Sequence, residues 1–168
     1  EGLGLRVIEV PADPKTGLDL DFLKKVLKKQ KVSAAIVMPN FSNPLGSLMP
    51  DDHKRELLTL LERYGVPAIE DDIYAELPFQ GERPKPLRAF DLSESVITCS
   101  SFSKTVTPGL RIGWVASGKR HFEEIRRHQL STTMGAGALA QRVMSTYVAS
   151  KYYEKNLKKL RLTCSINV

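Results

Sequence analysis

The residues best suited to chemistry lie between Ser101 and Arg111. One lysine, Lys104, stands among small hydroxyl residues on a loop that contains proline and glycine, and Arg111 follows seven positions later. The amine of a lysine forms a Schiff base with an aldehyde only in its neutral form, which nearby positive charge and partial burial favour. Hydroxyl donors and a charged planar fork hold a phosphate, and the segment supplies them from Ser101, Ser103 and Arg111. An aldehyde that carries a phosphate is pyridoxal 5′-phosphate, so this segment predicts a site for that cofactor.

Two segments upstream supply partners for the ring of such a cofactor. Asn43 opens a polar turn after the apolar run 34–38, and Asp71, three residues before Tyr74, follows the run 66–69. The pyridine nitrogen needs a carboxylate beside it, so that the ring stays protonated and acts as an electron sink. The phenolic oxygen needs donors, which an asparagine amide and a tyrosine hydroxyl provide. The order of these residues therefore strengthens the prediction.

These groups need elements that bring them together. We expect a turn at 13–17, helices at 21–29 and from 50 to Gly65, and more helix from 121 onward with breaks near Gly135 and Gly137. We expect strands at 6–10, 34–38, 66–70, 95–99 and 111–116. The strand at 34–38 is wholly apolar, which is typical of a strand buried on both faces of a parallel sheet. This alternation favours a three-layer α/β/α fold with a mostly parallel sheet, in which ligand-binding groups gather at the strand ends.

With these residues in this order, the chain resembles the class I and II aminotransferases of pyridoxal-phosphate fold type I. The resemblance runs from Arg6 to about Arg161. The amino-acid sequences of segments 70–77, 99–104 and 108–114 are most similar to those of MocR-type regulators. Those are GntR-superfamily transcription factors in which an aminotransferase-like domain follows a winged-helix DNA reader.

The resemblance implies a role for each candidate residue. Lys104 would carry the cofactor as a Schiff base and then move the substrate proton, and Asp71 would pair with the pyridine nitrogen. Asp72 is expected to point away from the ring, because side chains alternate along an extended segment. The phenolic oxygen and the phosphate would be held by Asn43 and Tyr74, and by Ser101, Ser103 and Arg111, respectively.

Taken singly, most of these residues also have a simpler interpretation. Asn43 before a proline suits an ordinary turn, and Asp71 can satisfy backbone amides at the end of a strand. Tyr74 can pack half-buried with its hydroxyl in water, and Arg111 can pair with a carboxylate such as Glu70. Trp114 is expected to pack in the core behind the cofactor.

The length of 168 residues suits one domain with a hydrophobic core. Members of the family are usually more than twice as long, so the resemblance implies that 1–168 is part of the large domain. It places the phosphate cup and the ring-stacking residue upstream of Glu1, and the small domain downstream of Val168. The residues 163–168 depart from the family's expected helix. Without the missing parts, we expect no transamination by this chain alone.

Composition narrows the class of protein. The apolar fraction of 42% and the charged fraction of 26% are those of a soluble globular protein, and no apolar run approaches the length of a membrane span. Two cysteines form no disulfide framework, and no spacing indicates a metal site. The net charge of +6 comes mainly from predicted helices, where basic faces are usually solvated. We expect a cytoplasmic protein.

Two functions stay open for the whole protein. In a MocR-type regulator, the cofactor and an amino compound would switch DNA binding through a winged-helix domain that precedes this chain. In a free-standing aminotransferase, an amino group would pass from an α-amino acid to a 2-oxo acid. The family implies a homodimer in either case. The amino-acid sequence around 99–114 favours the regulator. A third interpretation is a structural fragment that binds no cofactor.

Overall fold

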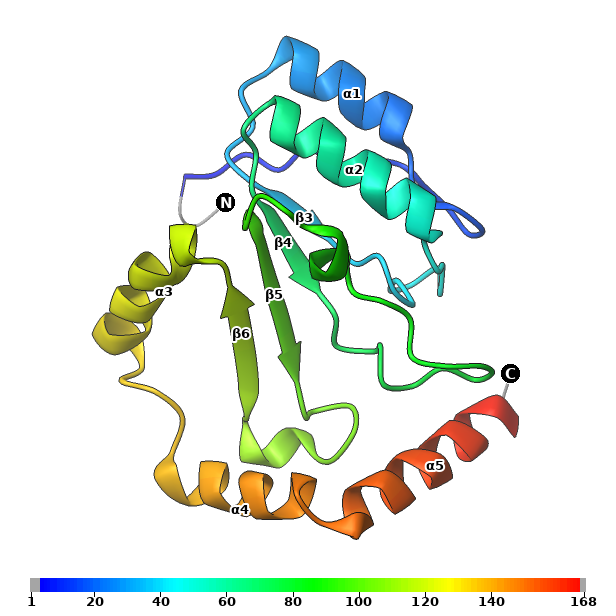
Figure 1. The fold of residues 1–168 in the computed structure, drawn as a ribbon, viewed down its shortest axis with the longest axis vertical. Helices are drawn as coiled ribbons and strands as arrows, with labels where there is room; N and C mark the ends of the chain where they lie inside the picture. The colour runs from blue at the N-terminus through cyan, green and yellow to red at the C-terminus, as the bar shows by residue number, and fades with distance from the viewer. Residues whose placement is uncertain (1–3, 167–168) are drawn as a thin grey trace.

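The structure is a computed structural model that describes residues 4–166 (Figure 1). Its helices are α1 (Leu20–Lys29), α2 (Asp51–Arg63), α3 (Lys119–Thr132), α4 (Ala138–Val148) and α5 (Lys151–Ile166), with 3₁₀ helices η1 (Leu87–Phe90) and η2 (Pro108–Leu110). Its strands are β1 (Ala12–Asp13), β2 (Gly17–Leu18), β3 (Ala35–Val37), β4 (Ala68–Asp71), β5 (Val96–Ser101) and β6 (Gly113–Ser117). Within 4–166, no helix is both long and apolar enough to cross a membrane.

The central sheet has the strand order β3-β4-β5-β6. The first three strands are parallel and β6 runs antiparallel to β5. The carboxyl ends of β3, β4 and β5 therefore meet at one edge of the sheet, and α4 and α5 run across that edge (Figure 1). The α/β class and the mostly parallel sheet are as predicted.

The hydrophobic core lies on one face of this sheet, between the strands and the helix pair α1–α2. Both helices present an apolar stripe to it, and its buried members are Leu23, Leu27, Val37, Met49, Leu57, Leu58, Leu61, Val66, Ala68, Leu87 and Val96. Helix α1 begins where the Asp19 carboxylate accepts the N–H of Phe22 at 2.8 Å, and α2 begins with two acids that suit the helix dipole.

The opposite face of the sheet is more open, which corrects the prediction for 34–38. In the register, Ile36 lies beside Ile69, and Ile69 beside Ile97, so the three side chains share a face. Ile36 is 77% exposed, so β3 is buried on one face only. Trp114 in β6 lies beside Ser100, on the same face as Thr98 and the core, yet it is 42% exposed, so the prediction that it packs in the core is also wrong. An apolar run predicts a strand, but burial depends on the elements that cover it.

The predicted strand at 6–10 is absent from the described chain. A strand needs a neighbour for its backbone groups, and the sheet offers none to this segment, where Val7 is 73% exposed. Instead, β1 and β2 form a short antiparallel hairpin around the predicted turn at 13–17. Strand β6 begins at Gly113 rather than Arg111, because Arg111 ends η2 with a left-handed backbone.

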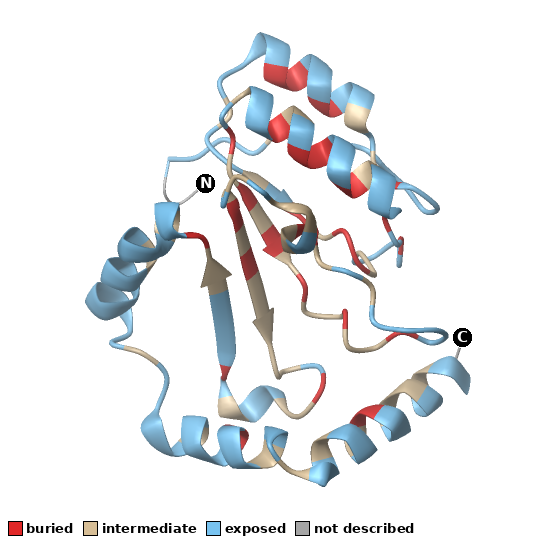
Figure 2. Ribbon diagram, in the orientation of Figure 1, coloured by how far each residue is buried: buried red, intermediate tan, exposed pale blue. Residues whose placement is uncertain are grey.

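The helices of the second half are largely exposed (Figure 2). The chain breaks between α3 and α4, as predicted near Gly135 and Gly137, and again between α4 and α5, which the sequence reading missed. Helix α5 contacts the edge where the strands end, since Asn156 donates to the Thr105 carbonyl at 2.8 Å. Residues 163–166 continue α5, and 167–168 lie outside the described residues.

Candidate functional site

Asp71 is the last residue of β4 and lies beside Cys99 of β5. One of its carboxylate oxygens accepts the N–H of Ile73 at 3.2 Å, which starts the turn that carries Tyr74. Because Asp71 shares a face with Ile69, its carboxylate lies on the open face of the sheet, away from the core. The Asp71 carboxylate is therefore available to a ligand bound on that face.

Lys104 lies on the loop that follows β5. The Phe102 carbonyl accepts the N–H groups of Val106 and Thr107 at 2.8 and 3.1 Å, so the loop turns tightly and leaves the Lys104 side chain exposed. The Lys104 amine lies 5.9 Å from the centre of the Tyr74 ring. The structure therefore brings together two predicted residues that are far apart in the sequence.

The predicted phosphate-binding residues gather where β5 and β6 meet. Ser101 ends β5 beside Gly113, and its hydroxyl accepts the N–H of Ser103 at 3.3 Å. A side chain at Gly113 would place its Cβ 2.9 Å from the Ser100 carbonyl oxygen, so this contact requires glycine. Arg111 lies two residues before Gly113 and has a left-handed φ of 53°. Its guanidinium is exposed at the same end of the strands.

Arg111 does not pair with Glu70, so that alternative is wrong. The Glu70 side chain is fully buried on the core side of the sheet. It accepts the backbone N–H groups of Leu87 and Arg88 and the hydroxyl of Thr98. Strand alternation therefore sends Glu70 and Asp71 to opposite faces.

Asn43 lies on the loop after β3, at the same edge of the sheet. The bridge between Asn40 and Leu48 closes this loop, and the Asn43 N–H donates to the Met38 sulfur at 3.1 Å. Within residues 4–166, no hydrogen bond joins the Asn43 amide to Asp71, Tyr74 or Lys104. The structure thus brings Asn43 to the same edge of the sheet as Asp71, but no hydrogen bond within the described residues joins its amide to the other candidate residues.

The charges at this edge suit a phosphate-bearing ligand. In the part of the chain that the structure describes, neither Lys104 nor Arg111 forms an ion pair with a carboxylate. Two cations without a carboxylate partner and the Ser101 hydroxyl therefore stand at the edge of the sheet where Asp71 ends β4. The donors fit an anion such as a phosphate, and the Asp71 carboxylate can accept a hydrogen bond from a protonated ring nitrogen; pyridoxal phosphate has both groups.

Residues 1–163 match the family model for aminotransferase class I and II. The chain belongs to this family. Among similar proteins, the uncharacterized HTH-type transcriptional regulator YdcR of Escherichia coli (strain K12) is 42% identical over 161 residues, which cover 96% of this chain and 34% of YdcR. The HTH-type transcriptional regulator NorG of Staphylococcus aureus (strain USA300) is 33% identical over 161 residues, 96% of this chain and 36% of NorG. The chain spans about a third of the length of these relatives.

Solved aminotransferase structures share the fold. The Pyrococcus horikoshii kynurenine aminotransferase in complex with PMP superposes with a TM-score of 0.85 at 32% identity, over 92% of this chain and 39% of that one. LysN, an α-aminoadipate aminotransferase of Thermus thermophilus complexed with N-(5′-phosphopyridoxyl)-L-leucine, gives 0.85 at 28% identity, over 93% and 40%. The aminotransferase fold predicted from the sequence is confirmed.

Asp72 points away from Asp71, as predicted, and belongs to a buried polar cluster that the sequence reading missed. Burial raises the pKa of Asp72, while the hydrogen bond from Asn40 and the charge of Arg83 oppose that shift. The same cluster includes Lys54, whose side chain is 1% exposed. One signal was available, because Lys54 falls at helical spacing with Leu57, Leu58 and Leu61 on the buried face of α2.

Proposed function

We propose that this chain is part of the large domain of an aminotransferase-like protein and holds pyridoxal 5′-phosphate through Lys104. The observation that carries the proposal is the meeting of Lys104 and Tyr74, at 5.9 Å, beside the end of the strand that bears Asp71. The relatives' structures complexed with PMP and with a phosphopyridoxyl amino acid add support.

Each predicted residue has a task in this site. The Lys104 amine would hold the cofactor, and it would accept and return the proton of the substrate Cα. The Asp71 carboxylate would accept a hydrogen bond from the ring nitrogen and so would favour its protonated form. The bound cofactor supplies an electron sink. The remaining residues would donate hydrogen bonds to two parts of the cofactor. Asn43 and Tyr74 would hold the phenolic oxygen. The phosphate would be held by Ser101, Ser103 and Arg111.

For the whole protein, we favour a MocR-type transcriptional regulator. Four relatives named as HTH-type transcriptional regulators are 31–42% identical over nearly all of this chain. In that function, an amino compound bound beside the cofactor changes the affinity of a winged-helix domain for DNA. The parent protein is then a cytoplasmic homodimer, and DNA is contacted by the winged-helix domain alone.

A free-standing aminotransferase is the second candidate. Structures titled as aminotransferases match this chain at 28–32% identity with TM-scores of 0.84 to 0.87. In that case the substrates are an α-amino acid and a 2-oxo acid. The pocket residues serve both functions, so the segment that precedes Glu1 in the parent gene distinguishes them. A winged-helix segment with a linker indicates the regulator.

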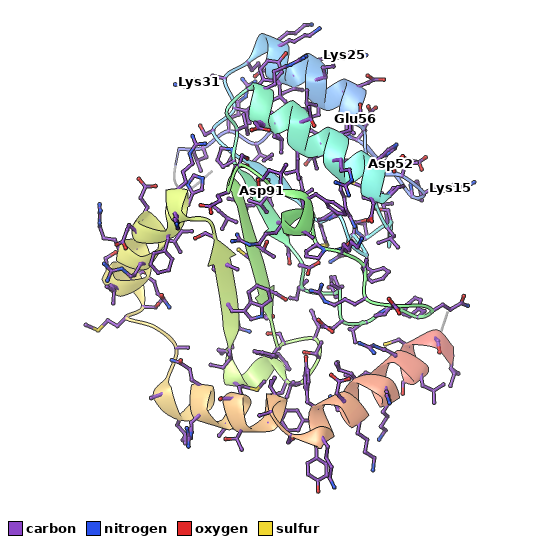
Figure 3. All side chains as sticks on the ribbon, in the orientation of Figure 1. Lys15, Lys25, Lys31, Asp52, Glu56 and Asp91 are labelled. Carbon is purple, nitrogen blue, oxygen red and sulfur yellow. The ribbon has the colours of Figure 1, made fainter. Side chains whose placement is uncertain are left out.

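The cofactor site is tested by covalent trapping. The chain is incubated with pyridoxal phosphate, reduced with borohydride, and analysed by intact mass and peptide mapping. We expect one adduct, at Lys104, that is absent from Lys104→Ala and present in the control Lys25→Ala, which removes an exposed lysine of α1 (Figure 3). An adduct of equal yield in Lys104→Ala, or labelling spread over surface lysines, would refute the proposal.

A further inference from the structure

A chain of buried hydrogen bonds runs behind the candidate site. The Lys54 ammonium donates to the Asn40 side-chain oxygen at 2.8 Å, and the Asn40 amide donates to one Asp72 oxygen at 2.9 Å. Arg83 donates to the other Asp72 oxygen at 2.6 Å. Lys54, Asn40 and Asp72 are at most 1% exposed. Four residues from four separate segments are thus joined in one line.

The direction of these bonds is fixed by the chemistry of the two ends. A lysine ammonium and an arginine guanidinium donate hydrogen bonds and accept none. Asn40 must therefore turn its oxygen to Lys54 and its amide to Asp72, and Asp72 must accept from both sides. The Lys85 carbonyl also accepts from Lys54 at 2.8 Å and from the Asn40 amide at 3.3 Å, which favours the same orientation of Asn40. Because Asp72 accepts from both Asn40 and Arg83, an amide in its place would meet a donor on one side.

Two members of this line lie close in sequence to residues of the candidate site. Asn40 closes the loop that carries Asn43, and Asp72 follows Asp71. The backbone of Asp72 also binds β5, because its N–H donates to the Cys99 carbonyl at 2.9 Å and its carbonyl accepts the Ser100 hydroxyl at 3.1 Å. The residues around Asp72 thus join the ends of β3, β4 and β5.

The line continues toward the last described helix. Arg83 also donates to the Glu76 carboxylate at 2.6 Å, and Glu76 lies two residues after Tyr74. From α5, Arg161 donates to the Glu76 carbonyl at 2.8 Å and its guanidinium lies 3.6 Å from the Glu76 carboxylate. The turn that bears Tyr74 is therefore held from both sides.

We propose that Asp72 is a positioning residue, which together with Asn40, Lys54 and Arg83 fixes the relative positions of the segments that carry Asn43, Asp71 and Tyr74. This proposal rests on the proposed function in assigning those segments to the cofactor. A buried network of this kind tolerates one arrangement, because a shift of any segment leaves a charged group without its partner. Apolar residues in the same place would tolerate small slips.

The test uses Asp72→Asn, with exposed Asp52→Asn on α2 as the matched control (Figure 3). The amide that this substitution introduces meets either Arg83 or the Asn40 amide, and a flip of Asn40 only moves the conflict to Lys54. We expect pyridoxal phosphate to bind about tenfold more weakly, because the segments shift to relieve the unsatisfied donor and binding must then bring it back into place. The absorbance band of the Lys104-bound cofactor should shift, and Asp52→Asn should change neither.

A second substitution separates positioning from loss of fold. Asn40→Asp exchanges the two side-chain types, so in Asn40→Asp/Asp72→Asn the carboxylate at position 40 accepts from Lys54 and from the amide at position 72, whose oxygen accepts from Arg83. We expect this double variant to regain most of the affinity and the absorbance band that Asp72→Asn loses. Equal affinity and an unchanged band in Asp72→Asn, or no recovery in the double variant, would overturn the proposal.

Hydrogen–deuterium exchange tests the same idea without the cofactor. In Asp72→Asn, we expect faster exchange at 40–47 and 71–76 and unchanged exchange in α1; unchanged exchange in those two segments overturns the proposal. If the unsubstituted chain does not bind pyridoxal phosphate, the proposed function fails while this measurement still decides the network. If Asp72→Asn does not fold, Arg83→Gln takes its place, because Arg83 is the partly exposed end of the line. Unchanged exchange at 71–76 in that variant then overturns the proposal.

Discussion

Replacing Glu70 by alanine is expected to lower the free energy of unfolding by about 3 kcal/mol. The Glu70 carboxylate is fully buried and accepts the N–H groups of Leu87 and Arg88 and the Thr98 hydroxyl. Alanine leaves both backbone donors without their acceptor, and each such group costs about 1–3 kcal/mol. The Arg88 contact is long, at 3.3 Å, so its share lies at the low end.

Glutamine at the same position separates hydrogen bonding from charge. Its oxygen can accept the Leu87 N–H, and the Thr98 hydroxyl can rotate to accept from its amide, so that only the long contact with the Arg88 N–H, at 3.3 Å, is lost. Burial raises the pKa of Glu70, so a neutral amide also avoids part of the desolvation that the carboxylate suffers. We expect Glu70→Gln to lose about 1 kcal/mol or less.

Urea unfolding followed by far-UV circular dichroism at pH 7 measures both variants. Glu56→Ala is the matched control, because Glu56 is exposed on α2 (Figure 3), and its effect should stay within about 0.5 kcal/mol. If Glu70→Ala lost no more stability than Glu56→Ala, the hydrogen-bond account of Glu70 would be wrong. Because Glu70 and Thr98 join β4 to β5, the expected loss also loosens the edge that carries Asp71.

Two further results are expected around the site. Burial raises the pKa of the Cys99 thiol, and the Asp71 carboxylate raises it further. Asp71→Asn should therefore lower that pKa, increase the thiolate fraction at pH 8 and speed alkylation by iodoacetamide, while Asp52→Asn leaves the rate unchanged. A slower or equal rate in Asp71→Asn contradicts the charge effect. Arg111→Gly should weaken pyridoxal phosphate binding about tenfold without lowering the unfolding free energy, since Arg111 has a left-handed φ of 53° that glycine adopts freely. Unchanged binding would exclude Arg111 from the phosphate site.

The positions of Asp71 and Lys104 were predictable because the signals for them are local. An apolar run predicts the strand before Asp71, and alternation places Asp71 and Asp72 on opposite faces. Proline and glycine after Lys104 predict a loop, whatever the rest of the chain does. Of the two breaks between the last helices, the first was predicted because glycines mark it. The second, at Ala149 and Ser150, was not predicted because no glycine or proline marks it.

The burial of Lys54 was not predictable in the same way. A lysine on an apolar helix face usually extends to solvent, and its burial depends on acceptors from distant segments, Asn40 and the Lys85 carbonyl, at 2.8 Å each. The exposure of Ile36 is the opposite case. Its apolar run predicted a strand buried on both faces, but the described chain covers only one.

The sequence by itself determined which chemical groups are present, their order, and the strands that end beside Asp71 and Ser101, because strand and loop signals act over a few residues. Only the tertiary structure decided that Lys104 faces Tyr74, that Asn40 and Arg83 share Asp72, and that β6 is antiparallel. Those facts depend on hydrogen bonds and packing between segments far apart in the chain, and no local pattern specifies which distant partner a segment meets.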